Sequence, residues 1–239
     1  MTHTLFIDEG NSRIKYWMSA GDDLTAQGHL QDILDLSSLR VNIDLIVVAT
    51  VKSTAELQRQ LISLYGHAMP IVWVSVQPAI LPTAYRDPTK LGIDRWLAVL
   101  AAKYLGSEVA IVVDAGTAIT IDVLDSLKGH AGGYILPGLS MQQASLAAHT
   151  ARVRFPSPDW CDESLGVDTA SAVGHGSVRA VCALVREMQS GGVSGQCPDV
   201  FLTGGNATDL AAFLPEARIE PNLVQIGLKA FQYYASDAP

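Results

Sequence analysis

The sequence predicts an α/β protein made of two similar halves, each a mixed β-sheet flanked by helices. Strand and helix periodicities alternate along the 239-residue chain, and an apolar strand ending in an Asp-x-Gly turn occurs twice, at Asp8 and at Asp114. The order of elements after the second turn resembles the order after the first. We expect domains at 1–105 and 106–239, with a ligand-binding cleft between them.

The first half begins with a three-stranded meander, whose second strand follows a tight turn at Gly10 and Asn11. Strands then alternate with helices, which indicates crossover connections within one mixed sheet. The elements expected in this half are strands at 3–8, 12–19 and 24–30, a short helix at 32–39, a strand at 44–49, a helix at 54–65, a strand at 71–76, a loop at 77–91 and a helix at 93–104.

The second half restarts the pattern after Gly106, which is expected to end the preceding helix. Three strands come first, and helices then surround one further strand. The elements expected here are strands at 109–114, 118–123 and 127–136, helices at 139–149 and 168–190, a strand at 199–203, and helices at 206–213 and 222–235.

Composition restricts the functional classes. The chain is 49% apolar, enough for a substantial core, and its net charge of −8 argues against nucleic-acid binding and favours a small-molecule substrate. No segment approaches the roughly 18 consecutive apolar residues of a membrane helix, and the N-terminus lacks the pattern of a signal peptide. Three cysteines without a C-x-x-C pair indicate neither a disulfide framework nor a zinc site. We therefore expect a cytoplasmic protein.

The two Asp-x-Gly turns, at 8–12 and 114–118, have the chemistry of a phosphate-binding site. Glycine leaves the backbone of each turn open to a ligand. A carboxylate repels phosphate, so its useful role is to hold a cation such as Mg²⁺, which bridges the two groups. One such turn is ordinary hairpin chemistry, but two matched copies favour phosphate binding. The accompanying donors and positive charge are Asn11, Ser12, Thr117 and Lys15.

A third cluster, residues 85–96, leads into the helix expected at 93–104. Asp94 and Arg95 lie in the first turn of that helix. An Asp there is favoured by the helix dipole, which is a purely structural explanation. The functional alternative makes Asp94 the acceptor of a proton from a substrate hydroxyl and Arg95 the partner of a substrate carboxylate. The pattern leaves both explanations open.

Two glycine pairs and the histidines are less specific. Gly132-Gly133 and Gly204-Gly205, the latter followed by Asn206, mark either close approach of a flat ligand such as adenine or a structural bend, with Asn206 as a helix cap. The six histidines show no metal-ligand spacing, and we expect surface or loop roles for them.

In this order and spacing the motifs resemble the type III pantothenate kinases of the actin-like kinase superfamily, over nearly the whole chain. The most discriminating segment is D-P-x-x-L-G-x-D-R, at 87–95. The resemblance implies two actin-like (ribonuclease H-like) domains and ATP-dependent phosphorylation of the primary hydroxyl of pantothenate to 4′-phosphopantothenate, the first step of coenzyme A synthesis. It also implies a homodimer that needs Mg²⁺ and a monovalent cation, K⁺ or NH₄⁺.

Site roles carry over by position. Asp94 resembles the general base and Asp114 the monovalent-cation ligand. The residues that resemble substrate contacts are Tyr85, Gly92, Ile93, Asp94, Arg95 and Thr169, and those that resemble ATP contacts are Asp8, Glu9, Gly10, Asn11, Ser12, Arg13, Ile14, Lys15 and Thr117. This chain departs from the common pattern at Glu9, where an apolar residue is commoner, and at Trp17, where many members carry a small residue.

Two alternatives belong to other functional classes. The first is a regulatory protein that keeps the nucleotide site without turnover, because some relatives have been described as accessory factors for transcription. The second is a kinase of the same architecture that acts on a sugar or on acetate. Asp94, Arg95 and Asp114 favour catalysis, since a binding protein needs no general base.

Overall fold

The computed structural model describes residues 1–10, 13–21, 23–38, 42–150 and 162–236. The chain divides into two compact units. The first unit consists of 1–80, 86–101 and 224–239, and the second unit consists of 81–85 and 102–223.

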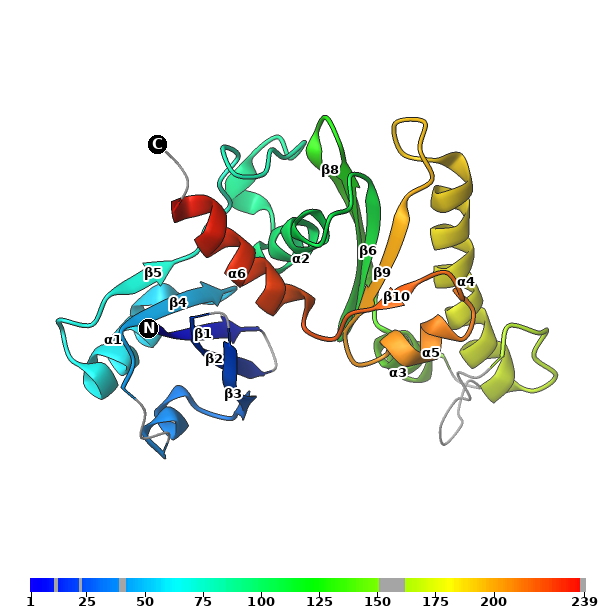
Figure 1. Ribbon diagram of the computed structural model, residues 1–239. Coiled ribbons are helices and arrows are strands. Elements are labelled where there is room, and N and C mark those ends of the chain that lie inside the picture. The colour runs from blue at the N-terminus through cyan, green and yellow to red at the C-terminus, as the bar shows by residue number, and fades with distance from the viewer. Residues whose placement is uncertain (11–12, 22, 39–41, 151–161, 237–239) are drawn as a thin grey trace. The chain divides into compact units, whose positions relative to one another are not determined.

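The first unit is built on a five-stranded mixed sheet of order β3-β2-β1-β4-β5 (Figure 1). Strand β1 pairs antiparallel with β2 and parallel with β4. The strands are β1 (His3–Glu9), β2 (Ile14–Ala20), β3 (Asp23–Leu30), β4 (Leu45–Thr50) and β5 (Ile71–Trp73), and the helices are η1 (Ile33–Ser38), α1 (Thr54–Tyr65), η2 (Pro88–Lys90), α2 (Ile93–Tyr104) and α6 (Leu223–Ser236).

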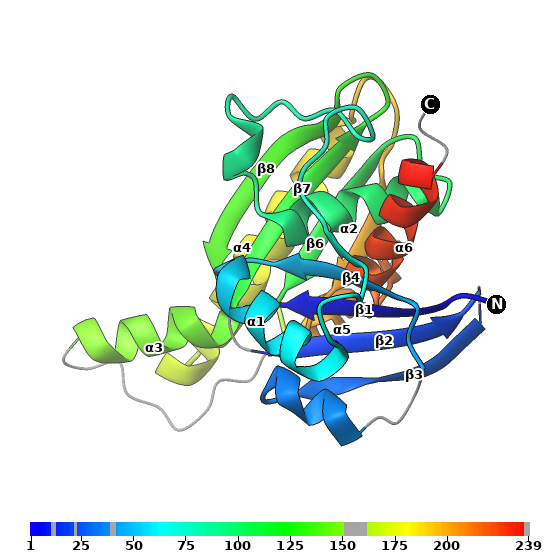
Figure 2. The same cartoon turned by 90° about the vertical axis from the view of Figure 1, so that its left-hand side faces the viewer.

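Alternation along β1 and β2 separates the two faces of this sheet. Leu5, Ile7 and Ile14 point to the face covered by α1 and η1, where they form a buried cluster with Leu57 and Leu61 of α1 (Figure 2). The alternate residues of the two strands lie on the opposite face. They include the candidate site residues Asp8 and Lys15.

Helices α2 and α6 approach each other closely in the first unit. The rings of Trp96 and Phe231 make an edge-to-face contact with their centroids 6.3 Å apart. A Cβ atom at Gly227 would lie 2.2 Å from the carbonyl oxygen of Leu97, so only glycine permits this crossing. The crossing ties α6 to α2, whose N-terminus carries Asp94.

The second unit contains another five-stranded mixed sheet, of order β10-β9-β6-β7-β8. Strand β6 is parallel to β9 and antiparallel to β7. Helix α4 lies along one face of this sheet (Figure 1) and supplies Val178, Val181 and Val185 to its core. The elements are β6 (Ala110–Ala115), β7 (Ala118–Asp125), β8 (Gly129–Pro137), α3 (Leu139–His149), α4 (Thr169–Gly191), β9 (Asp199–Thr203), α5 (Ala207–Ala211) and β10 (Arg218–Ile219).

An irregularity in the β7–β8 pairing explains the first glycine pair. The register passes from Asp122 opposite Gly133 to Leu124 opposite His130, so β8 carries one extra residue there. Gly132 has φ +111° in this bulge, and a Cβ atom at Gly133 would lie 2.1 Å from the carbonyl oxygen of Ile121. Of the two explanations left open for this pair, the structure supports the bend.

The two mixed sheets with flanking helices confirm the predicted fold class. The helices predicted at 54–65, 93–104 and 139–149 have these bounds in the structure, because their apolar periodicity and terminal breakers are local signals. The segment expected to be a helix at 32–39 is the 3₁₀ helix η1, and the two-residue strand β10 is too short to have a recognisable periodicity. Among the described helices, none combines the length and the apolarity needed to cross a membrane. The domain boundary between 105 and 106 stays a prediction.

Candidate functional site

The first cluster of candidate residues lies where β1 and β2 meet. Asp8 is directly opposite Lys15 in the antiparallel pair, so the two side chains share one face of the sheet. The N–H of Gly10 donates to the carbonyl oxygen of Arg13 at 3.1 Å, which holds the two strands together across the turn. Asn11 and Ser12 lie outside the described residues. A carboxylate and an ammonium group thus flank the first Asp-x-Gly turn.

The carboxylate of Glu9 is engaged by residues from β4 and the loop that follows it. Thr50 Oγ1 donates to Glu9 Oε2 at 2.6 Å, and Lys52 Nζ lies 3.6 Å from Glu9 Oε1. The N–H of Lys52 also donates to Thr50 Oγ1, at 3.0 Å. Sequence reasoning missed Thr50 and Lys52, because only the parallel pairing of β1 with β4 brings Thr50 opposite Glu9.

Trp17, the second departure from the family pattern, is part of the core of the first unit. It lies opposite Phe6 on the same face as Asp8 and Lys15, and only 4% of its surface is exposed. Its indole is therefore buried in the first unit, on the face of the sheet to which Asp8 and Lys15 belong.

The N-terminus of α2 holds the next group. Asp94 Oδ1 accepts a hydrogen bond from the N–H of Arg95 at 2.9 Å. A Cβ atom at Gly92 would lie only 2.7 Å from that oxygen, so glycine makes room for the carboxylate. Ile93 is buried and anchors this turn, and Arg95 is only 6% exposed. The dipole of α2 favours the negative charge of Asp94 at this position.

The turn before α2 is closed by Asp87. Its Oδ1 accepts hydrogen bonds from the hydroxyl of Thr89 at 2.7 Å and from the N–H of Thr89 at 3.0 Å. These two hydrogen bonds, from the side chain and then from the backbone, lower the pKa of Asp87 below its ordinary value. The Asp-Pro-x-x pattern in this motif therefore has a local structural cause, the capping of the 3₁₀ helix η2.

In the second unit, Asp114 lies near the end of β6 against the glycine loop that follows β9. The parallel pairing puts Asp114 opposite Thr203. Gly204 has φ +88°, and a Cβ atom there would lie 2.4 Å from Asp114 Oδ1 and 2.6 Å from the carbonyl group of Ala115. The N–H of Asn206 donates to the carbonyl oxygen of Ala115 at 2.9 Å. Gly204 of the second glycine pair therefore packs on the second Asp-x-Gly turn.

The glycine that follows β8 also packs on the turn at 114–118. The N–H of Gly138, which directly follows β8, donates to the carbonyl oxygen of Thr117 at 3.0 Å. A Cβ atom at Gly138 would lie 2.4 Å from the carbonyl oxygens of Gly116 and Thr117. Thr117 itself is exposed. The turn at 114–118 is thus enclosed by backbone from two other motifs, with Thr117 at its outer side.

Asn206 does not cap the helix that it precedes. Its side-chain Nδ2 donates to Asp209 Oδ2 at 2.8 Å, and it makes no capping hydrogen bond to the backbone. Asn206 therefore occupies the N-cap position of α5, but its side chain does not supply the capping hydrogen bond considered as its role.

The expectation of surface or loop roles is wrong for two histidines. His130 is fully buried in β8, and its ring centroid lies 5.7 Å from that of Tyr85. His175 is 9% exposed in α4, with Nδ1 3.1 Å from the carbonyl oxygen of Ser164. Both find polar partners in other elements, His130 with Thr83 and His175 with Ser164, which local patterns cannot reveal.

Thr169 is the first residue of α4 and is exposed. The preceding residue, Asp168, caps the helix: its Oδ1 accepts from the N–H of Ser171 at 2.9 Å, and the Ser171 hydroxyl lies near the N–H of Asp168. Hydrogen bonds from the Ser171 backbone and side chain lower the pKa of Asp168 below its ordinary value. The cap gives Thr169 a defined position at the helix start.

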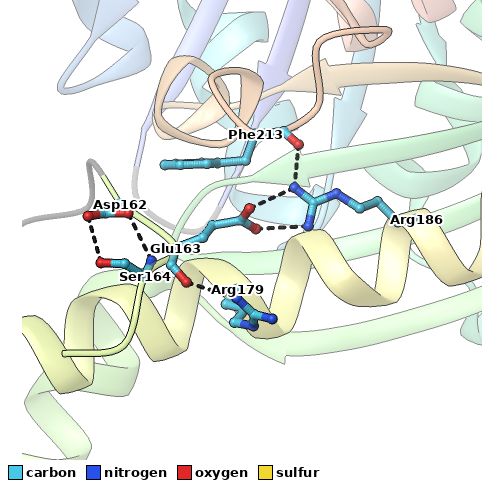
Figure 3. Close-up of polar contacts among 6 residues, drawn as sticks. All are labelled: Asp162, Glu163, Ser164, Arg179, Arg186 and Phe213. Carbon is cyan, nitrogen blue, oxygen red and sulfur yellow. Dashed lines mark hydrogen bonds and ion pairs between the residues drawn. The ribbon is translucent and has the colours of Figure 1, made fainter.

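The loop before this cap, residues 162–167, is attached to α4 by hydrogen bonds from α4 to Glu163 (Figure 3). Arg186 donates to both carboxylate oxygens of Glu163, at 3.0 and 2.8 Å, and to the carbonyl oxygen of Phe213 at 2.6 Å. Arg179 donates to the carbonyl oxygen of Glu163 at 3.0 Å. A bidentate Arg–carboxylate pair of this kind is well ordered, so the loop has a defined backbone.

Comparison with known proteins shows consistent similarities. A family model described as type III pantothenate kinase matches residues 4–190. A type III pantothenate kinase from Marinobacter nauticus is 34% identical over 94% of this chain and 96% of its own length. One from Acinetobacter baylyi is 33% identical over 96% of each chain.

Solved structures with lower identity share the fold. A conserved putative Baf family transcriptional activator from Campylobacter jejuni has a TM-score of 0.65 at 23% identity, covering 97% of this chain and 99% of its own. A putative 2-dehydro-3-deoxygalactonokinase from Sinorhizobium meliloti has a TM-score of 0.57 at 15% identity, covering 96% and 98%. At these identities the likeness concerns the architecture alone.

The packing of Gly204 on Asp114 gives a first prediction. Gly204→Ala introduces a Cβ atom at a positive φ and against the Asp114 carboxylate, and we expect it to lower the free energy of unfolding by roughly 1–3 kcal/mol. Gly205→Ala is the matched control, because a Cβ atom at Gly205 meets no atom within 4 Å. Urea denaturation followed by circular dichroism measures both. Equal stability of the two variants would contradict the close packing.

Proposed function

Because the chain belongs to the type III pantothenate kinase family, we propose that it transfers the γ-phosphoryl group of ATP to the primary hydroxyl of pantothenate. The product is 4′-phosphopantothenate, and the reaction is the first step of coenzyme A synthesis. The family match over residues 4–190 carries this assignment, since it spans the phosphate turns and the D-P-x-x-L-G-x-D-R segment.

Asp94 is the general base in this proposal. Its Oδ1 is oriented by the N–H of Arg95, and we assign Oδ2 to the substrate hydroxyl. As the hydroxyl oxygen forms its bond to the γ-phosphorus, its proton passes to the Asp94 carboxylate and ADP leaves with the electrons of the broken P–O bond. The helix N-terminus and the glycine at position 92 support a carboxylate at this place.

The acceptor contacts are Tyr85, Gly92, Ile93, Arg95 and Thr169. Arg95 suits the carboxylate of pantothenate, because a guanidinium group binds a carboxylate through two parallel hydrogen bonds. Its low exposure, 6%, supports this role, because an ion pair formed away from water is electrostatically stronger.

Residues 8–15 and Thr117 hold the phosphates of ATP. Lys15 supplies a positive charge, and Asp8 supplies a carboxylate on the same sheet face. Among the described residues no group of three or more His, Cys, Asp or Glu side chains could by itself enclose a metal ion. Mg²⁺ would therefore be shared between a carboxylate such as that of Asp8, water and the phosphates of ATP, which is the common arrangement for this ion. When bound, Mg²⁺ neutralises phosphate charge.

A monovalent cation, K⁺ or NH₄⁺, is assigned to Asp114. The donor set fits such an ion: the Asp114 carboxylate and the Ala115 carbonyl oxygen both face the place where Gly204 packs on the turn. Oxygen donors of this kind are those that hard cations prefer. When bound, the ion adds positive charge beside the phosphate-binding turn.

We further assign a cytoplasmic homodimer. Leu165 and Val167 are 89% and 95% exposed, although the loop that carries them is latched to α4 by Glu163. Apolar side chains held in a defined position at the surface are suited to a partner, and the exposed start of α4, with Thr169, lies next to them in the chain.

The regulatory alternative is not favoured. The chain has Asp94, Arg95 and Asp114 at the positions that the family's chemistry uses. The similarity to a protein described as a transcriptional activator lies at 23% identity, at which only the fold is comparable.

The base assignment is tested by Asp94→Asn. We expect kcat for pantothenate phosphorylation to fall by about 10²–10⁴-fold, because the amide cannot accept the proton. A coupled ADP-release assay measures the rate. Asp23→Asn, at an exposed position in β3, is the matched control and keeps the wild-type rate. A folded Asp94→Asn enzyme with normal turnover rejects Asp94 as the base, and a wild-type enzyme without pantothenate turnover rejects the proposed reaction.

Monovalent-cation dependence tests Asp114. We expect the wild-type enzyme to be stimulated when K⁺ replaces tetramethylammonium, and Asp114→Asn to need at least about tenfold more K⁺ for the same stimulation, since one charge beside the ion is lost. Titration of the steady-state rate with KCl at constant ionic strength measures this. Identical K⁺ titrations for both proteins would exclude Asp114 as the ligand.

The dimer is tested by Leu165→Lys. A charge on the exposed apolar pair is expected to raise the dimer dissociation constant by at least about tenfold. Leu127→Lys is the matched control, because Leu127 is equally apolar and 85% exposed but lies in the β7–β8 turn. Sedimentation velocity reports the association state. A monomeric wild-type protein, or equal effects of the two changes, would refute this interface.

A further inference from the structure

A buried ionisable pair in the second unit has no role in the proposed site. His130 in β8 is 0% exposed and Asp122 in β7 is 2% exposed. His130 Nε2–H donates to Asp122 Oδ1 at 2.7 Å. Burial of such groups is costly unless they are hydrogen-bonded to each other, so the pair is expected to hold a fixed geometry.

The other ring nitrogen of His130 faces the segment that carries Tyr85. Nδ1 lies 3.2 Å from Thr83 Oγ1, and the N–H of Tyr85 donates to the same Oγ1, also at 3.2 Å. Nε2 donates to the carboxylate of Asp122, and Nδ1 forms the second hydrogen bond of the ring, with the Thr83 hydroxyl. Hydrogen bonds thus connect Asp122 to the backbone of Tyr85 through two side chains.

The backbone of His130 holds the same segment. The N–H of Ala84 donates to the carbonyl oxygen of His130, and the N–H of His130 donates to the carbonyl oxygen of Pro82, both at 2.8 Å. Thr83 and His130 form a single parallel bridge. Gly129, with φ +67°, permits this approach, since a Cβ atom there would lie 2.4 Å from the Pro82 carbonyl oxygen.

A bridge of one residue is a weak attachment for a loop, so the side-chain links matter. The His130 ring also touches Tyr85 directly, with an angle of 56° between the ring planes. The bulge in β8 contributes as well, because it places Gly133 beside Asp122. A Cβ atom at position 133 would lie 2.7 Å from Asp122 Oδ1, so only glycine leaves room for the carboxylate. Gly133 thus makes room for Asp122, whereas Gly129 and His130 lie directly against residues 82–85.

We propose that Asp122 and His130 position Tyr85 for the acceptor substrate by fixing residues 82–85 against β8. This inference rests on the proposed function, in which Tyr85 contacts pantothenate. His130 touches no substrate here: it is a positioning residue that acts through Thr83 and Tyr85. Binding of pantothenate should therefore depend on the Asp122–His130 pair, whereas binding of ATP should not.

The sharpest variant is Thr83→Val, which keeps the shape of the side chain and the Asp122–His130 pair but removes the hydroxyl link to Tyr85. We expect KM for pantothenate to rise about tenfold, with kcat within about twofold and KM for ATP unchanged. His130→Gln retains an amide donor that can reach Asp122 and should have a smaller effect than His130→Asn, which is too short to reach it. A smaller effect of His130→Gln than of His130→Asn would show that the hydrogen bond to Asp122 is needed to hold the segment.

A double-mutant cycle separates positioning from a general loss of structure. In a Tyr85→Ala background, Thr83→Val should not raise KM for pantothenate further, because the side chain through which it acts is absent. Ser194→Ala is the control, because it removes a hydrogen bond to Asp125 at the end of β7 without contact to this network. Additive effects in the cycle, or equal rises in both KM values, overturn the proposal.

Hydrogen exchange of the free protein gives a readout that needs no substrate. Mass spectrometry should show faster exchange of the amides of residues 83–85 in Thr83→Val, by about tenfold, and unchanged exchange in Ser194→Ala. Unchanged exchange in Thr83→Val overturns the positioning role. If wild-type protein does not phosphorylate pantothenate, the proposed function fails, and the exchange result still decides whether the pair holds the segment.

Discussion

Parallel strand pairing brings residues from distant parts of the sequence to one edge of each sheet, and the candidate site depends on it. In the first unit, β1 and β4 end together, so that Thr50 and Lys52 reach Glu9. In the second unit, β6 and β9 end together, so that Gly204 packs on Asp114. Carboxyl ends of neighbouring parallel strands meet at one edge, which is where α/β proteins generally bind ligands.

Close backbone approach is the second shared constraint. Gly92, Gly138 and Gly204 each occupy a place where a Cβ atom would collide with a candidate carboxylate or with the backbone of the second Asp-x-Gly turn. A site built in this way leaves its carboxylates and carbonyl groups little freedom to move. Such pre-organisation suits phosphoryl transfer, in which the protein acts mainly by positioning charge. The glycines are therefore part of the proposed mechanism and not merely of the turns.

Hydrogen-bonded polar pairs between neighbouring strands add a different kind of order. Glu9 with Thr50, and Asp122 with His130, each join two strands through a hydrogen bond to a carboxylate. Leaving such a carboxylate without its partner costs more than the bond itself contributes, so each pair restricts its neighbours to one arrangement. In the first unit this restriction affects the first Asp-x-Gly turn, and in the second it affects the segment that carries Tyr85.

The sequence by itself determined most of the elements, and all of the motifs. Helices at 54–65 and 93–104 have local periodicity and local breakers, and the order and spacing of the Asp and Gly motifs are sufficient to predict the family. Only the tertiary structure decided which residues come into contact. Examples are the buried hydrogen bond between His130 and Asp122, the hydrogen bond from Thr50 to Glu9, and the close approach of backbone at Gly133. These depend on strand register and on pairing between distant segments, and neither leaves a signal within a short stretch of sequence.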